Sequence, residues 1–520
     1  MRLNLSDTFN KELPTDSNNK NTRRQVFEAT HSYVNPKVPS EPELIHASHQ
    51  MVEAIGLEEK DISSKEFLEI FSGIKIYPKT KPYAMAYAGH QFGNWAGQLG
   101  DGRAINLFEV EHDNKRWAVQ LKGAGETPYS RQGDGLAVLR SSIREYLCSE
   151  AMHYLGVPTT RVLSLMLSGD DVLRDMLYDG NREYEKGAIV ARVAPTFIRF
   201  GNFELFAARK DYKNLKKLTD YTIKYFYPEL GQQSKETYIK FFKEVSKRTL
   251  EMIIHWQRVG FVHGVMNTDN MSILGSTIDY GPYGWLEDFD FGWTPNTTDK
   301  QNKRYRFGNQ PNIGLWNLLQ LANALYPLVE EAEPFETILN HYQKDFETQS
   351  LQMMRSKLGL KHADEEDSKL ITDLEDCLLL SETDMTIFFR LLSDFKKNEF
   401  EVAIEQIQEA FYKPEEIKGK VLEQWQGWFK AYDKRLHKET LRDDERKAHM
   451  NKVNPKYVLR NYMAQLAIDD ANKNDYNLID ELFELLKQPY AEQPENDKWF
   501  AKRPDWARHK VGCSMLSCSS

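Results

Sequence analysis

Residues 263–279, followed by Tyr280-Gly281, constrain this chain more than any other part of the sequence. Asp269 and Asn270 end the polar turn that begins this stretch, and Asp279 closes it after an apolar segment. An enzyme acting on a nucleoside triphosphate needs a divalent cation, amide or carboxylate oxygens to hold it, and a carboxylate near the attacking group. This stretch contains the amide and carboxylate oxygens that could hold the cation and a further carboxylate for the attacking group. It therefore predicts a nucleotide and metal site.

The order of these residues resembles the catalytic segment of protein kinases, with one change. In kinases the third residue of a His-Arg-Asp or His-Gly-Asp turn is the base, and a metal-binding Asn and an Asp-Phe-Gly follow. Here Val265 occupies the third position, and Asp269 is the nearest acid. Two interpretations stay open, an inactive kinase or an enzyme that performs another reaction on the same nucleotide. A plain turn is the structural alternative, because Asn, Thr and Asp favour turns.

The part of the chain before this stretch has the element order of a kinase upper lobe. Residues 83–103 are rich in Gly and aromatic residues, and residues 104–110 and 116–122 then predict two strands joined by a polar turn. The second strand ends in Lys122. A lysine at this place would hold phosphate groups.

A helix should follow Lys122 and carry an acid to pair with it. Apolar residues recur every fourth position from Leu139 to Leu147, and Gly156 closes the run. Glu145 lies on another face of this helix, and we expect it to pair with Lys122. Glu150 is the weaker rival, and a surface position for Glu145 is the alternative.

Two glycine-rich segments bracket Lys122: Gly100-Asp-Gly-Arg103 before it and residues 123–135 after it. Glycine lets backbone N–H groups approach phosphate oxygens, so two such segments suggest an enlarged phosphate cradle. Glycine-rich loops are more often plain turns, and only the position beside Lys122 supports the cradle. Arg192 and Arg199 flank Pro195 further along. Guanidinium groups suit phosphate, although the residues alone favour two surface ion pairs.

Composition limits the class of protein. The chain has 520 residues, 41% hydrophobic and 28% charged, which is typical of a soluble globular protein. No apolar run approaches the roughly 20 residues of a membrane span. With 68 Lys and Arg against 77 Asp and Glu, the net charge is −9, so we expect neither nucleic acid nor a membrane as the main partner. The amino terminus lacks a signal core, and four Cys cannot build a disulfide framework, so we expect a cytoplasmic protein.

The predicted elements divide the chain into four parts. Residues 1–80 form an N-terminal arm with little structure up to about residue 45 and a helical pattern from residue 43 to 71. Residues 81–200 form a kinase-like N-lobe, and residues 201–330 a C-lobe with helices over 211–226 and 235–259 and a strand over 271–278. Residues 331–520 form a helical C-terminal extension with a Cys-containing tail. We therefore predict an α+β, protein-kinase-like two-lobe fold.

Several motifs together resemble the selenoprotein O family, and the resemblance extends from about residue 80 to the carboxyl end. They are Gly100-Asp-Gly-Arg103, Val119-Gln-Leu-Lys-Gly-Ala-Gly125, Gln132-Gly-Asp-Gly135, residues 192–201, the stretch from His263 to Ser272, and Ile278-Asp-Tyr-Gly-Pro282. Members resemble protein kinases but lack the usual base. They bind ATP in the inverted orientation and transfer AMP to Ser, Thr or Tyr hydroxyls of other proteins. Uridylyl transfer from UTP is also attributed to members.

The resemblance implies a role for each matching residue of this chain. Asp269 would be the base, Asn270 and Asp279 would bind Mg²⁺ or Mn²⁺, and Glu145 would position Lys122. Nucleotide contacts would come from Gly100, Gly102, Arg103, Lys122, Asp134, Gly135, Arg192, Arg199 and Asp279. Because the nucleotide is inverted, its α-phosphate would face the acceptor.

The tail also resembles the family. Some members end with selenocysteine three positions from the terminus, and Cys518-Ser-Ser520 occupies that place. Cys513 and Cys518 are therefore a candidate redox pair, with two free thiols as the alternative. Two rival functions stay open besides AMP transfer: a metal-dependent kinase, and a silent pseudokinase that binds nucleotide and acts as a scaffold.

Overall fold

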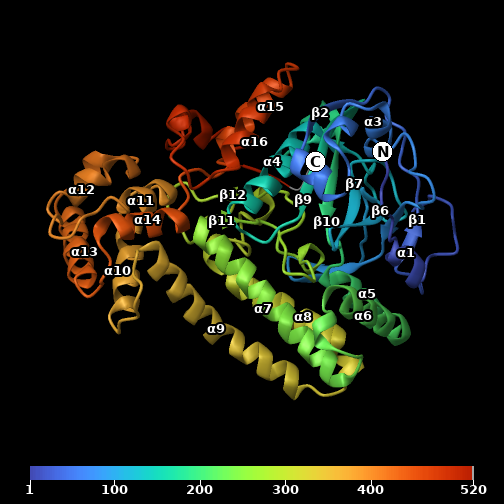
Figure 1. Cartoon of the computed structure of the whole chain (residues 1–520), viewed down its shortest axis with the longest axis horizontal. Helices are drawn as coiled ribbons and strands as arrows, with labels where there is room; N and C mark the ends of the chain where they lie inside the picture. Colours follow the sequence, from blue (N-terminus) through green and yellow to red (C-terminus); the bar gives the residue numbers. More distant parts are fainter. Residues whose placement is uncertain (514, 518–520) are drawn as a thin grey trace.

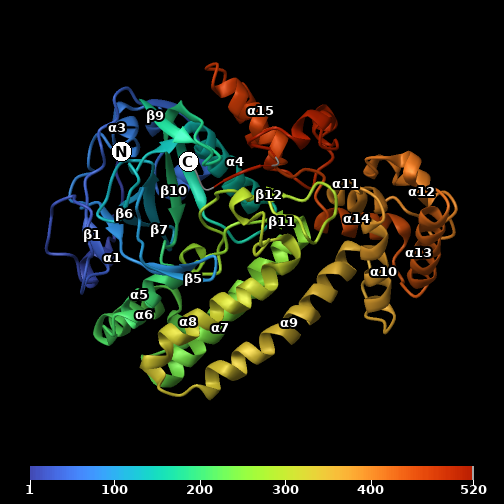
Figure 2. The ribbon, with the colours of Figure 1, turned by 180° about the vertical axis from the view of Figure 1, so that it is seen from behind.

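The computed structural model describes residues 1–513 and 515–517, which form a mixed α/β structure (Figure 1). One large sheet lies toward one end of the long axis, and a group of helices from α10 to α14 lies at the other end (Figure 1). The long helices α7, α8 and α9 connect these two regions along one side (Figures 1 and 2).

The main sheet has eight strands among the described residues, and its neighbouring strands run antiparallel. Seven follow the order β1-β3-β6-β7-β10-β9-β2, and β8 pairs with β10. Their bounds are β1 His31–Tyr33, β2 Glu43–Ala47, β3 Tyr83–Met85, β6 Ala104–His112, β7 Lys115–Lys122, β8 Ala137–Val138, β9 Arg161–Asp175 and β10 Arg182–Ala194. The predicted strands over 104–110 and 116–122 are confirmed as β6 and β7, which pair Ala104 with Lys122.

The N-terminal arm is more integrated than we expected. Its strands β1 and β2 form the two edges of the main sheet by pairing with β3 and β9. The predicted helical pattern is wrong at its start, because residues 43–47 are β2; α2 (His49–Ala54) and α3 (Lys65–Phe71) follow. Backbone pairing with β9 outweighs the local pattern there. The short α1 (Thr8–Glu12) packs through its buried Phe9.

The helices predicted around the site are confirmed. The acid-bearing helix is α4 (Leu139–Tyr154), and the two later ones are α6 (Tyr212–Phe226) and α7 (Lys235–Val259). Helix α7 begins at a Ser234 cap, whose side chain accepts from Thr237 N, and ends at Gly260 in the left-handed region. This places the chain at the start of the central stretch.

The predicted strand over 271–278 is wrong. Met271 and Thr277 form an isolated bridge across a turn at Gly275, whose φ is +67°. The remaining backbone groups bond elsewhere, with Ile273 N donating to Ile198 O and Thr277 N to Pro158 O. The segment is therefore a tight loop held by two neighbouring chain segments.

Two short pairs of strands flank the site. β4 (Ala88–Gln91) and β5 (Asn94–Gln98) form one hairpin, and β11 (Phe261–Val262) pairs with β12 (Gly284–Trp285). The hairpin lies against α5 (Phe200–Ala208) and the 3₁₀ turn η3 (Thr268–Asn270). From Gly281 to residue 309 the chain forms loops, apart from β12 and short 3₁₀ turns.

The rest of the chain is helical, as predicted. Its helices are α8 Gln310–Val329, α9 Glu333–Lys357, α10 Asp367–Leu379, α11 Met385–Leu392, α12 Ala403–Gln406, α13 Lys420–Leu436, α14 Asp443–Val453, α15 Asn461–Ala471 and α16 Asn477–Leu486. Helices α15 and α16 return to pack on α4 (Figure 1). The C-terminal extension thus supports the helix that carries Glu145.

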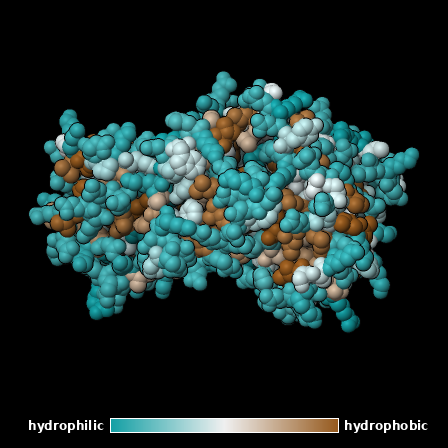
Figure 3. Space-filling model, turned by 90° about the horizontal axis from the view of Figure 1, so that it is seen from above, coloured by the Kyte–Doolittle hydropathy of each residue, from teal (hydrophilic) through white to brown (hydrophobic). Residues whose placement is uncertain are grey.

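In the described part of the chain, no helix combines the length and apolar character needed to cross a membrane. The face seen in Figure 3 is mostly hydrophilic, with apolar residues in small separate groups. The domain boundaries at residues 80, 200 and 330 stay predictions.

Candidate active site

Most of the residues that the sequence singles out line one cleft of about 1090 Å³. The sheet, the two glycine-rich segments, the η3 turn and the segment around Asp279 line it. The predicted site residues on its wall are Gly100, Gly102, Arg103, Lys122, Asp134, Gly135, Arg192, Arg199, Asp269, Asn270 and Asp279. Glu145 is the predicted residue that does not line the cleft.

Glu145 lies behind Lys122 and pairs with it. Lys122 Nζ is 2.5 Å from Glu145 Oε2, and both side chains are buried. Burial lowers the pKa of Lys122, and the charge of Glu145 opposes that shift. The rival Glu150 instead pairs with Arg161 at 2.7 Å, so the predicted pairing of Lys122 with Glu145 is confirmed.

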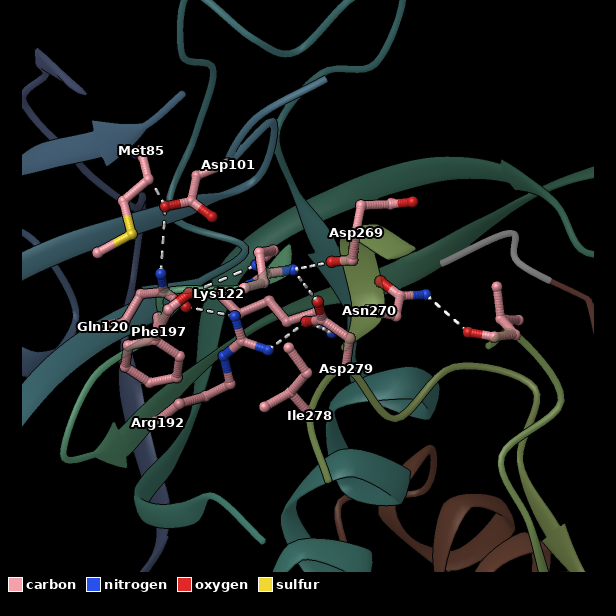
Figure 4. Close-up of polar contacts among 12 residues, drawn as sticks. Met85, Asp101, Gln120, Lys122, Arg192, Phe197, Asp269, Asn270, Ile278 and Asp279 are labelled. Carbon is pink, nitrogen blue, oxygen red and sulfur yellow. Dashed lines mark hydrogen bonds and ion pairs between the residues drawn. The ribbon is translucent and has the colours of Figure 1, made fainter. Parts of the chain in front are cut away.

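The interpretation of Arg192 and Arg199 as surface ion pairs is wrong. Both are 1% exposed. Arg192 pairs with Asp279 Oδ1 at 2.5 Å (Figure 4), and Arg199 pairs with Asp279 Oδ2 at 2.6 Å. Arg192 also donates to Glu145 at 2.9 Å. The sequence could not show this, because two distant segments must fold together to bury the charges.

The Asp279 carboxylate is the counter-charge of the three cations at the base of the cleft. Lys122 Nζ lies 3.7 Å from it, in addition to the two arginines. Burial would raise the pKa of Asp279, but Arg199, Arg192 and Lys122 hold it well below its usual range. The φ of Asp279 is +57°, an unusual conformation for a residue other than glycine or asparagine.

A polar network that the sequence analysis missed orients Arg192 from behind. Gln120 Oε1 accepts from Arg192 Nη2, and Gln120 Nε2 donates to Asp101 Oδ2 at 3.3 Å (Figure 4). Asp101 also accepts from Met85 N at 2.9 Å and from Asn106 at 3.1 Å. Gln120 and Lys122 are two positions apart on β7, so they lie on the same face of the sheet. This spacing was the signal that could have identified Gln120.

Asp269 stands in the η3 turn at the edge of the cleft. Its Oδ2 accepts from Gln91 Nε2 at 3.2 Å, and its backbone carbonyl accepts from Arg199 at 2.7 Å. Its Oδ1 is buried and has no hydrogen-bond partner. Burial raises the pKa of Asp269 to about 6, against the opposing effects of Gln91 and Arg199.

The β4–β5 hairpin covers the turn that holds Asp269. His90 N donates to Thr268 Oγ1 at 2.7 Å, and Phe92 N donates to Asn267 Oδ1 at 3.1 Å. Gly89 allows this close approach, since a Cβ there would lie 2.8 Å from Asp269 Oδ1. Gln91 and this hairpin were missed in the sequence, although they lie in its glycine-rich, aromatic segment.

Asn270 and Asp279 fit a hard divalent cation as a pair of oxygen ligands. Asn270 Nδ2 donates to Val265 O at 2.9 Å. The amide oxygen of Asn270 (Figure 4) is therefore available as a metal ligand. No group of three His, Cys, Asp or Glu that could hold a metal occurs among the described residues. Two protein oxygens with substrate phosphates are the usual set for Mg²⁺, so this donor set fits.

The two glycine-rich segments pack on each other at the cleft wall. Gly100 has a φ of +110°, and Tyr129 fills the space where its Cβ would stand. Asp134 forms two hydrogen bonds of 2.8 Å with Arg174, a residue that the sequence analysis missed. Burial would raise the pKa of Asp134, but these bonds keep it lowered.

Other candidates lie outside the site. Asp290, in the sequence Asp290-Phe291-Gly292, is not on the cleft wall. Cys513 is buried, and burial raises its pKa to about 11. Cys518 lies outside the described residues, so the redox pair stays a prediction.

We expect Lys122 and Glu145 to act as one unit. Lys122→Met and Glu145→Gln should each lower kcat/KM for the nucleotide about 100-fold, because each removes or misplaces the ammonium charge. The double variant should be no worse than the poorer single variant. Steady-state kinetics of the four proteins would check this, and additive losses would contradict the shared role.

The contact of the hairpin with α5 should be sensitive to a single methyl group. A Cβ at Gly201 would overlap Ala88 O, so Gly201→Ala should lower the free energy of unfolding by about 1–3 kcal/mol. Gly427→Ala is a matched control in helix α13, where no atom lies within 4 Å of the new Cβ. That variant should gain up to about 1 kcal/mol in denaturant unfolding. An equal response of both variants would contradict the close approach.

Comparison with known proteins agrees with this geometry. The family model described as protein adenylyltransferase SelO matches residues 17–487. A protein named protein nucleotidyltransferase YdiU from Flavobacterium johnsoniae is 63% identical, with the alignment covering 100% of this chain and 99% of the relative. Proteins of the same name from Rhodopirellula baltica and Aromatoleum aromaticum are 52% and 53% identical, again over 100% of this chain and 99% of each relative. The chain therefore belongs to the protein adenylyltransferase SelO family.

Proposed function

We propose that this protein transfers AMP from ATP to Ser, Thr or Tyr hydroxyls of other proteins. The observation that carries the proposal is that Asp269, with its raised pKa, lines the same cleft as three buried cations and two oxygen ligands of the kind that bind a metal. The names of the family and of its relatives support nucleotidyl transfer to proteins. UTP is a second candidate donor, which would give uridylyl transfer.

In the proposed reaction, the carboxylate of Asp269 accepts the proton of the acceptor hydroxyl. The hydroxyl oxygen forms a bond to the α-phosphorus, and the bond from that phosphorus to the bridging oxygen of the β-phosphate breaks. Pyrophosphate then leaves with the electron pair of the broken bond. A base whose pKa is about 6 is mostly ionised at neutral pH, which suits this task.

The distribution of charge in the cleft supports the inverted orientation of the nucleotide that the family resemblance implies. Lys122, Arg192 and Arg199 would bind the β- and γ-phosphates, because they gather the positive charge at its base. The α-phosphate would then lie toward Asp269. The backbone carbonyl of Asp269 accepts a hydrogen bond from Arg199. This bond links the proposed catalytic base to the proposed phosphate site.

Asn270 and Asp279 would hold Mg²⁺ or Mn²⁺, which would neutralise phosphate charge when bound.

The Lys122–Glu145 pair and the segment from His263 to Asp279 also support the proposal of a protein-kinase-like two-lobe fold. His263 Nε2 donates to Ile278 O at 2.8 Å and so ties the start of this segment to the residue before Asp279. The cytoplasmic location and the absence of a nucleic-acid partner remain proposals.

ATP labelled on either the α- or the γ-phosphate tests the function. The protein is incubated with Mg²⁺ or Mn²⁺ and a generic protein acceptor, and incorporated label is measured after acid precipitation. Label from the α-position only would support AMP transfer, and label from the γ-position only would support the rival metal-dependent kinase. Bound nucleotide without any transfer would favour the pseudokinase scaffold. Repeating the assay with α-labelled UTP would test uridylyl transfer.

A further inference from the structure

The tip of the β4–β5 hairpin lies beside Asp269, because Gln91 donates to its carboxylate. Gln91 and Phe92 at this tip line the cleft, and so do Asn267 and Thr298. Phe92 N also donates to Tyr305 Oη at 3.0 Å, and that hydroxyl donates to Asn267 at 2.6 Å. The segment from residue 300 to 306 therefore lies next to the hairpin tip, just after Thr298 of the cleft wall.

This segment is rich in cationic side chains. It contains Lys300, Lys303, Arg304 and Arg306 within seven positions, on a chain with a net charge of −9. None of the four forms an ion pair with a carboxylate in the part of the chain that the structure describes. The acid directly before the segment, Asp299, accepts from the backbone of Arg304 and Tyr305 at 2.9 and 2.7 Å.

Aromatic side chains hold the Arg304 guanidinium in place. It lies 4.7 Å from the ring centre of Trp316 and packs against the backbone of Gly93. Its Nε is buried without a hydrogen-bond partner. Trp95, on the same hairpin, contacts His90 and is 44% exposed. An arginine fixed by stacking loses little side-chain entropy when it binds a carboxylate.

We propose that Trp95, Lys300, Lys303, Arg304, Arg306 and Trp316 form an acceptor surface that binds an extended segment of the substrate protein with acidic residues beside the modified hydroxyl. This inference rests on the proposed function, since it assigns the surface to the acceptor. Three extended residues span about 10 Å, so acidic residues on either side of a hydroxyl at Asp269 can reach past the hairpin tip. The unpaired positive charge of the surface is complementary to such a segment.

Two synthetic peptides test the surface. Each has one Tyr acceptor in an Ala-rich sequence, with three Glu on both sides in one peptide and three Gln in the other. Binding is measured by fluorescence anisotropy with an ATP analogue that cannot be cleaved between the α- and β-phosphates. The Glu peptide should bind about tenfold more tightly at low salt, and the difference should shrink as the salt concentration rises.

Charge variants locate the effect. Lys300→Gln combined with Lys303→Gln changes two exposed side chains, leaves the Arg304 stack intact and should remove most of the preference. Lys418→Gln combined with Lys420→Gln makes the same change of charge on exposed residues of the C-terminal extension and should leave the preference unchanged. Arg304→Gln should also reduce the preference, while ATP affinity stays at the wild-type value.

Equal binding of the two peptides to the wild-type protein would overturn the inference. A preference that survives in the Lys300 and Lys303 double variant would overturn it as well. Because binding is measured without transfer, failure of the proposed function appears separately, as a lack of α-label in either peptide. A preference in binding that is matched by a preference in α-label transfer would support both.

Discussion

Replacing Asp279 by Asn should lower nucleotidyl transfer at least about 1000-fold, because the change removes a proposed metal ligand and the counter-charge of the phosphate-binding cations. Asn has nearly the same shape, so the loss would report charge and ligation. The variant leaves Lys122, Arg192 and Arg199 without their shared carboxylate. Its free energy of unfolding should therefore fall by roughly 2–4 kcal/mol. Transfer of α-label and denaturant unfolding would measure the two effects.

Asp290→Asn is the control for this variant. It makes the same change in the Asp-Phe-Gly sequence that does not line the cleft, and the Asn side chain can keep the hydrogen bond from Gly292 N, which is 2.7 Å. It should retain transfer within about twofold and unfold as the wild type does. Equal activity of the Asp279 and Asp290 variants would remove Asp279 from the site.

Replacing Asp269 by Asn should have the second largest effect. Transfer should fall about 100- to 10,000-fold, because an amide cannot accept the hydroxyl proton. ATP affinity should change little, since the cations that would bind the β- and γ-phosphates stay in place. Rapid-quench measurement of AMP transfer with nucleotide in excess would show the loss in the chemical step.

Gln91→Leu is a useful comparison for the Asp269 variant. It removes the hydrogen bond of 3.2 Å to Asp269 Oδ2 but keeps the carboxylate itself. It should reduce transfer by less than Asp269→Asn does, about tenfold, because the base is then less well oriented. If Asp269→Asn retained wild-type transfer while Gln91→Leu lost it, another group would have to accept the proton.

Local patterns determined the secondary structure around the site. The two apolar runs over 104–122, which a polar turn separates, and the apolar repeat from Leu139 specify β6, β7 and α4, because their lengths and spacing match those elements. The Ser234 cap and Gly260 set the bounds of α7 for the same reason, since capping is local. The predictions for β2 and for residues 271–278 were wrong, because the backbone partners of these segments lie far away in the chain.

The types of residue at the site were also determined by the sequence. Lys122, Asp269, Asn270 and Asp279 stand in motifs with short spacing, and the tertiary structure brings them to one cleft. The roles assigned to them remain proposals. What made these residues recognisable is that metal and phosphate chemistry limits the residue types and the spacing that a site can use.

Only the tertiary structure decided which charges are buried together. Arg192 and Arg199 look like surface residues in the sequence, yet they meet Asp279 inside the protein. The roles proposed for Gln91 and for the cationic segment from 300 to 306 likewise depend on where the fold places them relative to the hairpin tip. Charge pairing and burial depend on distances between segments remote in the chain. A local pattern therefore specifies an element and its chemistry, whereas packing decides which partners it meets.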